Sequence, residues 1–137
     1  MSEKFSGEWP DSNRHREGEE GRKYEVDAVI AEMRALLQNG SKEEAIELFR
    51  LWADAQERER GRLDAADKRD GIKGRSEAAK FFGVEIEWSR ARICAEAWGD
   101  REEAYEACKT AEQIAHFEML GEEILQKCEE KIREYEE

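Results

Sequence analysis

Apolar residues recur at intervals of three and four through most of the chain, the spacing that lines one face of an α-helix. The clearest stripe predicts a first helix over residues 24–38. Its members are Val26, Val29, Ile30, Met33, Leu36 and Leu37. The Asn-Gly pair at 39–40 is a typical left-handed stop. Ser41 and Glu44 then have the spacing of a capping box, so a second helix begins at once. So short a turn makes residues 24–60 an antiparallel helical hairpin.

The second helix has a strong apolar stripe only in its first half. That stripe consists of Ala45, Leu48, Phe49 and Trp52. Residues 56–62 offer nothing to a core, so we expect this helix to project beyond the core, and the pattern leaves open whether it bends at Gly61. The pattern leaves open whether residues 41–70 form one helix or two. Glycines then mark residues 70–75 as a linker.

The second half of the chain repeats this pattern of a glycine stop followed by a helix start. A helical region over residues 76–98, bent or interrupted at Gly83, ends at Gly99, and a second capping box begins at Asp100. The region over residues 101–136 carries two successive stripes. The first is Ala104, Cys108, Ala111 and Ala115, and the second is Phe117, Leu120, Ile124, Cys128, Ile132 and Tyr135. Gly121 lies where they join, which leaves open whether this region is one helix or two.

The two capped hairpins, at residues 26–55 and 85–115, resemble the hairpin of a tetratricopeptide repeat. In that family a small residue near the start of the second helix lets two helices approach closely, as Ala45 and Ala104 would here. The two copies lie further apart than the roughly 34 residues of that repeat. The resemblance therefore supports antiparallel hairpin packing and no more.

These patterns predict an all-α protein made of antiparallel hairpins in a small bundle with projecting long helices. Residues 1–22 have too few large apolar groups to offset the entropy of ordering, so we expect a disordered tail. Residues 23–137 are expected to form a single all-helical domain.

The composition indicates how large a core this domain can have and in which compartment we expect it. Only 39% of the residues are hydrophobic and 42% are charged, so the core must be narrow. No apolar run approaches the ~20 residues that span a bilayer, and the first residues lack the apolar stretch of a signal peptide. The cysteines Cys94, Cys108 and Cys128 lie within helical patterns and are expected to be buried free thiols. We therefore expect a cytoplasmic protein.

The net charge of −12 opposes direct binding to nucleic acid or anionic lipid. Residues 76–93 nevertheless resemble a helix-turn-helix DNA reader, with Gly83 and Val84 at its turn, which implies a DNA-binding regulator as an alternative function. Glu85 and Glu87 would then face DNA and repel it. The basic residues that would contact DNA are Arg62, Arg69, Lys73 and Arg75.

A third interpretation comes from acid spacing. Glu43-Glu44-x-x-Glu47 followed by Asp64-x-x-Asp67 resembles the acidic metal-binding pairs of helical nucleotide pyrophosphohydrolases. Magnesium held in that way needs carboxylates that converge from facing helices. A solvated helix face explains these acids equally well in a chain with 35 acidic residues. We assign no catalytic, cofactor-binding or metal-binding residue.

The interpretation that uses most of these observations is a non-enzymatic, acidic, helical protein-interaction module. Its partner would be a protein with a basic surface, and an inhibitor or regulator would occupy a nucleic-acid-binding surface with carboxylates in place of phosphates. In composition the chain resembles small acidic helical proteins of phages and mobile elements. Self-association is left open. The candidate contact residues are Glu122, Glu123, Glu129, Glu130, Trp88 and Trp98.

Overall fold

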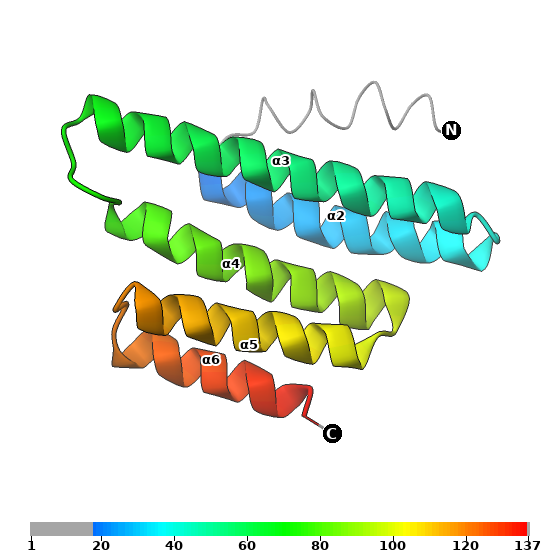
Figure 1. Ribbon diagram of the computed structural model, residues 1–137. Helices are drawn as coiled ribbons and strands as arrows, with labels where there is room; N and C mark the ends of the chain where they lie inside the picture. The colour runs from blue at the N-terminus through cyan, green and yellow to red at the C-terminus, as the bar shows by residue number, and fades with distance from the viewer. Residues whose placement is uncertain (1–17, 137) are drawn as a thin grey trace. The chain divides into compact units, whose positions relative to one another are not determined.

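The computed structural model describes residues 18–136, with side chains from Val26 onward. Most of the predicted tail over residues 1–22 therefore lies outside the described residues. The described part is all-helical and contains no strand, which confirms the predicted fold class. Its elements are α2 (Gly18–Gln38), α3 (Lys42–Arg69), α4 (Glu77–Ile93), the π-helical turn η1 (Cys94–Trp98), α5 (Arg101–Phe117) and α6 (Glu122–Glu134), as Figure 1 shows.

The contacts within the chain group it into two compact units, Met1–Ala55 and Gln56–Glu137. We call the first the hairpin unit and the second the C-terminal unit. The boundary falls inside α3, which runs from Lys42 to Arg69 as one helix and passes Gly61 without a break. The question of one helix or two in residues 41–70 is thereby answered.

The hairpin unit is built by the tight turn between α2 and α3. Gly40 adopts the left-handed φ of 77°, and the Ser41 amide donates to the Leu36 carbonyl at 2.8 Å. This turn reverses the chain, so the predicted antiparallel hairpin is confirmed (Figure 1). The stripes of the two helices supply large buried side chains. These are Val29, Ile30, Met33, Leu48 and Trp52, all at most 4% exposed.

In the C-terminal unit, α5 buries small residues, whereas α4 buries larger ones such as Phe82 and Ile93. At the turn after η1, Gly99 has a φ of 72°, and the Asp100 side chain accepts from the Glu103 amide at 3.1 Å. The predicted capping box is thus half formed, because the Asp100 amide donates to the Cys94 carbonyl instead. The buried stripe of α5 consists of Ala104, Ala107, Cys108, Ala111 and Ala115. Residues 101–136 form two helices, which separate at a turn that ends at Gly121, where φ is 105°.

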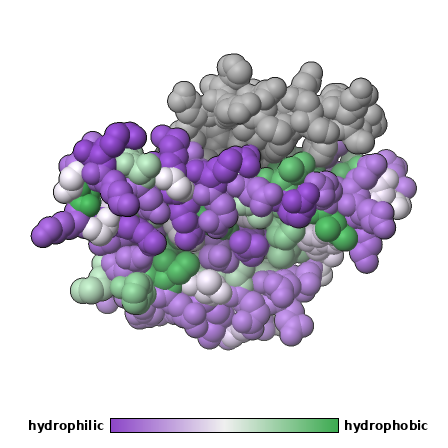
Figure 2. All heavy atoms as spheres, turned by 45° about the horizontal axis from the view of Figure 1, so that its top comes forward, coloured by the Kyte–Doolittle hydropathy of each residue, from purple (hydrophilic) through white to green (hydrophobic). Residues whose placement is uncertain are grey.

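Hydrophilic residues cover most of the face that Figure 2 draws, and hydrophobic residues interrupt them only in small groups. This surface agrees with the charged fraction of 42%. Within the described residues, no helix combines the length and the apolar character that crossing a membrane requires.

Candidate functional site

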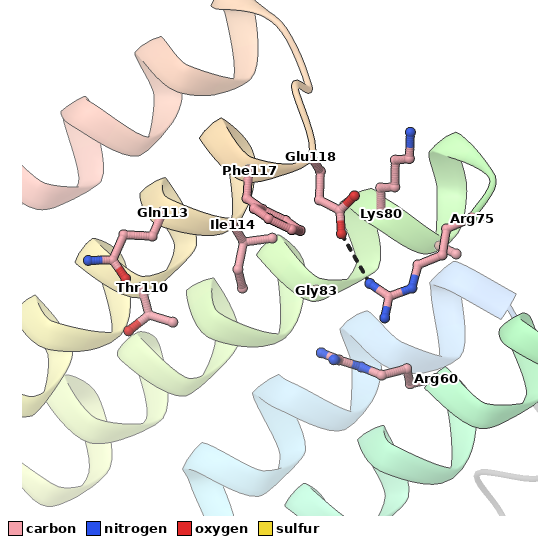
Figure 3. Close-up of a pocket in the computed structure, with 10 residues that line it drawn as sticks. Arg60, Arg75, Lys80, Gly83, Thr110, Gln113, Ile114, Phe117 and Glu118 are labelled. Atoms are coloured by element: carbon pink, nitrogen blue, oxygen red, sulfur yellow. Dashed lines mark hydrogen bonds and ion pairs between the residues drawn. The ribbon is translucent and has the colours of Figure 1, made fainter.

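A groove of about 340 Å³ opens within the C-terminal unit, between the first half of α4 and the second half of α5 (Figure 3). The α5 side carries Thr110, Gln113, Ile114 and Phe117, whose spacing places them on one helix face. The opposite wall and the two ends complete the lining. These residues are Ala79, Lys80 and Gly83 of α4, Arg60 of α3, Arg75 of the linker, and Glu118.

The floor of the groove depends on a missing side chain. Gly83 lies in the middle of α4, and a Cβ built there would come 3.7 Å from Cγ2 of Ile114 and 3.6 Å from Nη2 of Arg60. Both distances are ordinary contact distances, so a larger residue at this position would occupy groove space. The small residues Ala79 and Gly83, one helical turn apart, are both buried, and Gly83 lets Ile114 and Arg60 lie close to the backbone of α4.

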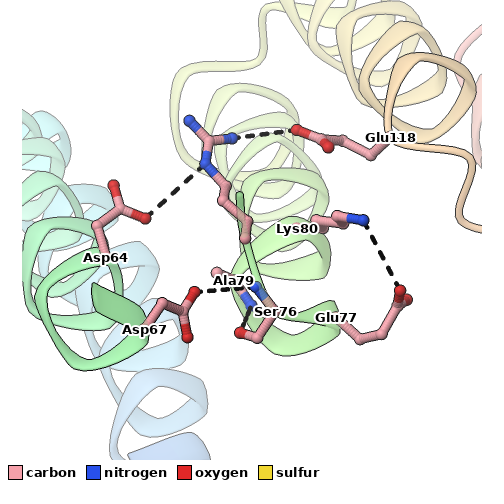
Figure 4. A network of polar contacts seen from close by, with 8 residues as sticks. Asp64, Asp67, Ser76, Glu77, Ala79, Lys80 and Glu118 are labelled. Atoms are coloured by element: carbon pink, nitrogen blue, oxygen red, sulfur yellow. Dashed lines mark hydrogen bonds and ion pairs between the residues drawn. The ribbon is translucent and has the colours of Figure 1, made fainter. Parts of the chain in front are cut away.

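A polar network at one end of the groove fixes the linker (Figure 4). The Arg75 guanidinium donates to Glu118 Oε2 at 3.1 Å. Its Nε lies 3.8 Å from the buried Asp64 Oδ1, too far for a hydrogen bond, so this second contact is ionic only. The Ser76 amide donates to Asp67 Oδ2 at 2.9 Å, and the Ser76 hydroxyl accepts from the Ala79 amide at 3.2 Å. These contacts join the end of α3 to the start of α4.

The groove carries more positive than negative charge. Three cations, Arg60, Arg75 and Lys80, line it with a single carboxylate, Glu118, which Arg75 already binds. Lys80 lies 3.9 Å from Glu77, whose side chain is 82% exposed, so this pair is weak. Among the described side chains, no carboxylate lies within ion-pair distance of the half-buried Arg60. The groove is thus a basic site on a protein of net charge −12.

The turn between α5 and α6 exposes two large apolar side chains beside this groove. Phe117 and Met119 are each 84% exposed. Met119 also has a φ of 56°, a left-handed conformation that costs a non-glycine residue roughly 1–2 kcal/mol. Backbone bonds hold it there, since the Leu120 amide donates to the Ala115 carbonyl at 3.0 Å. We call residues 117–123 the α5–α6 corner.

The predicted acidic contact residues continue from this corner along α6. Glu122, Glu123, Glu129 and Glu130 are all exposed, and none forms an ion pair with another described side chain. Acids on other helices do pair, as Glu47 does with Arg50 and Glu59 with Arg62, each at 2.6 Å. Carboxylates without cation partners keep their full charge available to a partner molecule.

The two predicted tryptophans differ from these acids. Trp88 is half-buried and packs against the core of the C-terminal unit, edge-on to Phe81 at 5.7 Å between ring centroids. Lys131 lies over its ring at 5.0 Å. The indole Nε1 of Trp88 is buried without a hydrogen bond of standard geometry. Burial raises the pKa of the Cys128 thiol, and a weak interaction with Trp88 lowers that pKa by a smaller amount. Trp98 is half-buried in η1. Most of the Trp88 surface therefore serves packing.

The helix-turn-helix interpretation of residues 76–93 is wrong in its geometry. Residues 77–93 form one uninterrupted helix, and Gly83 lies inside it rather than at a turn. A reader of that class needs a turn that aims a second helix into the major groove of DNA. The proposed DNA contacts also differ among themselves. Arg62 binds Glu59 and Arg75 binds Glu118, while Arg69 and Lys73 are exposed.

The pyrophosphohydrolase interpretation is also contradicted by the element boundaries. Both acidic pairs lie on the single helix α3, so their carboxylates do not converge from facing helices. Asp64 and Asp67 contact Arg75 and Ser76 instead. Within the described residues, no cluster of three or more His, Cys, Asp or Glu side chains could hold a metal ion.

The cysteines are buried free thiols, as expected from their place in the helical stripes. Burial raises the pKa of Cys94 to about 11, with Glu103 adding to the effect, and burial likewise raises the pKa of Cys108 to about 11. The thiols therefore stay protonated at neutral pH, in the form that is a poor nucleophile.

The sequence reasoning missed Phe117, Met119 and Arg60 as site residues. Phe117 continues an apolar stripe and was expected in the core, whereas the structure exposes it at the last residue of α5. The signal was present in the sequence, because Glu118 follows Phe117 and Gly121 marks the end of the helix, so that the stripe changes helix at this point.

Comparison with known proteins gives no match to a family model, a curated protein or a solved structure. A proposal of function therefore rests on the geometry of the corner and the groove.

Proposed function

We propose that this protein is a non-enzymatic protein-interaction module that binds a partner through the α5–α6 corner and the acidic face of α6. The observation that carries this proposal is the exposure of Phe117 and Met119, each 84%, on a backbone held in a costly conformation. Folding alone gives no reason to place two large apolar side chains in water. Aromatic residues and methionine are enriched at protein interfaces, where a partner removes them from water.

The charge around this corner specifies the partner. Glu122 and Glu123 are the last two residues of the corner, and Glu129 and Glu130 continue the acidic face about two turns further along α6. An apolar centre with an acidic margin fits a partner surface that has an apolar pocket bordered by Lys and Arg. Surfaces rich in Lys and Arg bind the phosphates of nucleic acids, so an inhibitor that replaces phosphates by carboxylates is the specific form of this proposal.

The test begins with capture of binding proteins from the native host on three baits. The first bait is the wild-type protein, and the second changes the acidic face to Gln at Glu122, Glu123, Glu129 and Glu130. The third is a matched control that changes four exposed acids elsewhere to Gln, namely Glu32, Glu44, Glu57 and Glu106. A true partner should be retained by the wild type and the control and lost from the acidic-face variant.

The association kinetics of the captured partner then test the mechanism. Electrostatic steering raises association rates by about 10–10³-fold, so the acidic-face variant should associate roughly tenfold more slowly or worse at low salt. Its dissociation rate should change much less. Gln is a helix former comparable to Glu, so circular dichroism should show an intact α6. Equal rates for the variant and the control would show that these acids serve solubility, and the proposal would fail.

A further inference from the structure

The C-terminal unit carries two adjacent surfaces of opposite character. One is the basic groove, with an apolar floor at Gly83 and Ile114, and the other is the α5–α6 corner, with exposed apolar side chains followed by acids. Phe117 belongs to both, since it lines the groove and also begins the corner. We infer that the occupant of the groove is the corner of a second copy of this chain, in a symmetric dimer.

Charge complementarity is the first argument for this occupant. Arg60 has no described carboxylate partner, and Lys80 has only the weak pair with Glu77 at 3.9 Å, so two groove cations are available. Arg75 is not available, because Glu118 and Asp64 engage it. On the corner, Glu122 and Glu123 are exposed without a described cation partner. Two available cations thus match two available acids.

The apolar parts match in the same way. The groove volume of about 340 Å³ is small, close to the lower limit of typical ligand pockets, and suits one or two side chains rather than a folded element or a nucleic-acid duplex. Met119 of the second copy has the flexible, unbranched side chain that fills irregular apolar spaces. Inserting it would bury an 84% exposed side chain against Ile114 and the other residues that line the groove.

The positions of the corner and the groove also suit a two-fold symmetric contact. A two-fold interface requires one patch that is complementary to itself, so that corner meets groove twice. Corner and groove share Phe117 and lie on one compact unit, which meets this requirement. The contact area is modest, so the dimer should be weak and reversible.

Such a dimer would also regulate the proposed function. The inference of a dimer rests on the proposed function only in that both use the α5–α6 corner. A copy whose corner lies in another copy's groove cannot present Phe117 and Met119 to a different protein. Dimer and partner complex would therefore exclude each other, and the partner would bind the monomer. Dilution or excess partner would release the corner.

Sedimentation velocity on the full chain tests the inference. Between about 10 µM and about 1 mM, a range that covers weak affinities, the wild-type sedimentation coefficient should rise from that of a monomer to that of a dimer. The rise should weaken with added salt, because exposed ion pairs are screened. A wild type that remains monomeric across this range, at low salt, would overturn the inference.

Two charge-reversal variants locate the contact. The corner variant is Glu122→Lys with Glu123→Lys, and the groove variant is Arg60→Glu with Lys80→Glu. Each alone should remain monomeric, because it places like charges opposite each other. An equimolar mixture of the two variants should dimerise again. In the mixed dimer, Lys on the corner of one copy meets Glu in the groove of the other copy. The second contact between corner and groove keeps the wild-type charges.

A matched control separates this effect from general charge. Glu129→Lys with Glu130→Lys makes the same change of net charge on α6 outside the corner and should still dimerise. Circular dichroism and thermal unfolding check that all three variants remain folded. If the mixture stays monomeric while each variant is folded, the corner does not meet the groove and the inference is wrong.

The same variants keep the two proposals distinguishable. The groove variant should lose dimerisation but keep its affinity for a basic partner, since its acidic face is unchanged. Binding of a labelled oligonucleotide by the wild type, abolished in the groove variant, would identify the groove as a nucleic-acid site and overturn the dimer. A wild type that dimerises yet captures no partner would leave the dimer established and the proposed function wrong.

Discussion

The helices of the hairpin unit and helix α5 of the C-terminal unit bury different kinds of side chain. The hairpin unit buries large ones, with Met33, Leu48 and Trp52 at most 1% exposed. The C-terminal unit buries large side chains along α4, such as Phe82 and Ile93, but only small ones along α5, and it leaves Phe117 and Met119 84% exposed. The comparison shows that a stripe of alanines brings helices close together but leaves little room between them for a large side chain.

Because of this difference, the apolar side chains of the two units contribute differently to stability and to recognition of a partner. In the hairpin unit, most of the apolar surface contributes to folding, since each buried large side chain gains about 1.5–3 kcal/mol. In the C-terminal unit, part of the apolar surface is left in water at the α5–α6 corner, next to the groove that Gly83 and Ile114 line. Substitutions in the two units should therefore differ in which property they change.

The largest effect is expected at Trp52, which is 1% exposed and stacks on Phe49 with ring centroids 5.8 Å apart. Trp52→Ala should destabilise the protein by about 3–5 kcal/mol, through lost burial and the cavity that remains. Urea unfolding followed by circular dichroism measures this cost. A variant that melts within a few degrees of wild type would show that the hairpin unit does not depend on its large residues.

Overpacking should reveal the opposite constraint in the C-terminal unit. Ala111 is fully buried in a cluster with Val84, Ala115 and Cys128. Ala111→Leu should cost about 1–3 kcal/mol, because close-packed helices must separate to admit the larger side chain. The same unfolding experiment measures it. A stabilised variant would indicate free space beside α5 and would remove the contrast between the two units.

The linker contact should have a smaller effect. Asp67 is 7% exposed and accepts the Ser76 amide at 2.9 Å. Asp67→Ala should cost about 1–2 kcal/mol through the lost hydrogen bond. Hydrogen exchange should show faster exchange at Ser76, while Ser41, at the turn of the hairpin unit, serves as the internal control. Unchanged exchange at Ser76 would show that the linker is held by other contacts.

The smallest effect on stability is expected at Phe117. Phe117→Ala should change the free energy of unfolding by no more than about 0.5 kcal/mol, because the side chain is 84% exposed. The same variant should weaken dimerisation and partner binding. A large loss of stability would place Phe117 in the core, as its apolar spacing had indicated.

Local signals in the sequence predict the helices and most of their ends. The apolar stripe of residues 26–37, the stop at Gly40, the break at Gly99 and the cap at Asp100 are local signals that act over a few residues, and the structure follows each of them. Net charge and spacing also placed Glu122, Glu123, Glu129 and Glu130 on an exposed helix face. These features depend on neighbours along the chain, so the pattern alone could predict them.

Other features depend on what packs against each helix, and local signals do not predict them. The sequence predicts a bend or an interruption at Gly83, but α4 continues through it, and Gly83 lies buried beside Ile114 at the groove. Phe117 has the spacing of a core residue, yet the chain turns directly after it and leaves it exposed. Arg60 became part of a basic site only because α3, α4 and α5 bring distant residues together. Periodicity specifies which face of a helix is apolar, but burial requires a second surface, and that surface comes from residues far away in the sequence.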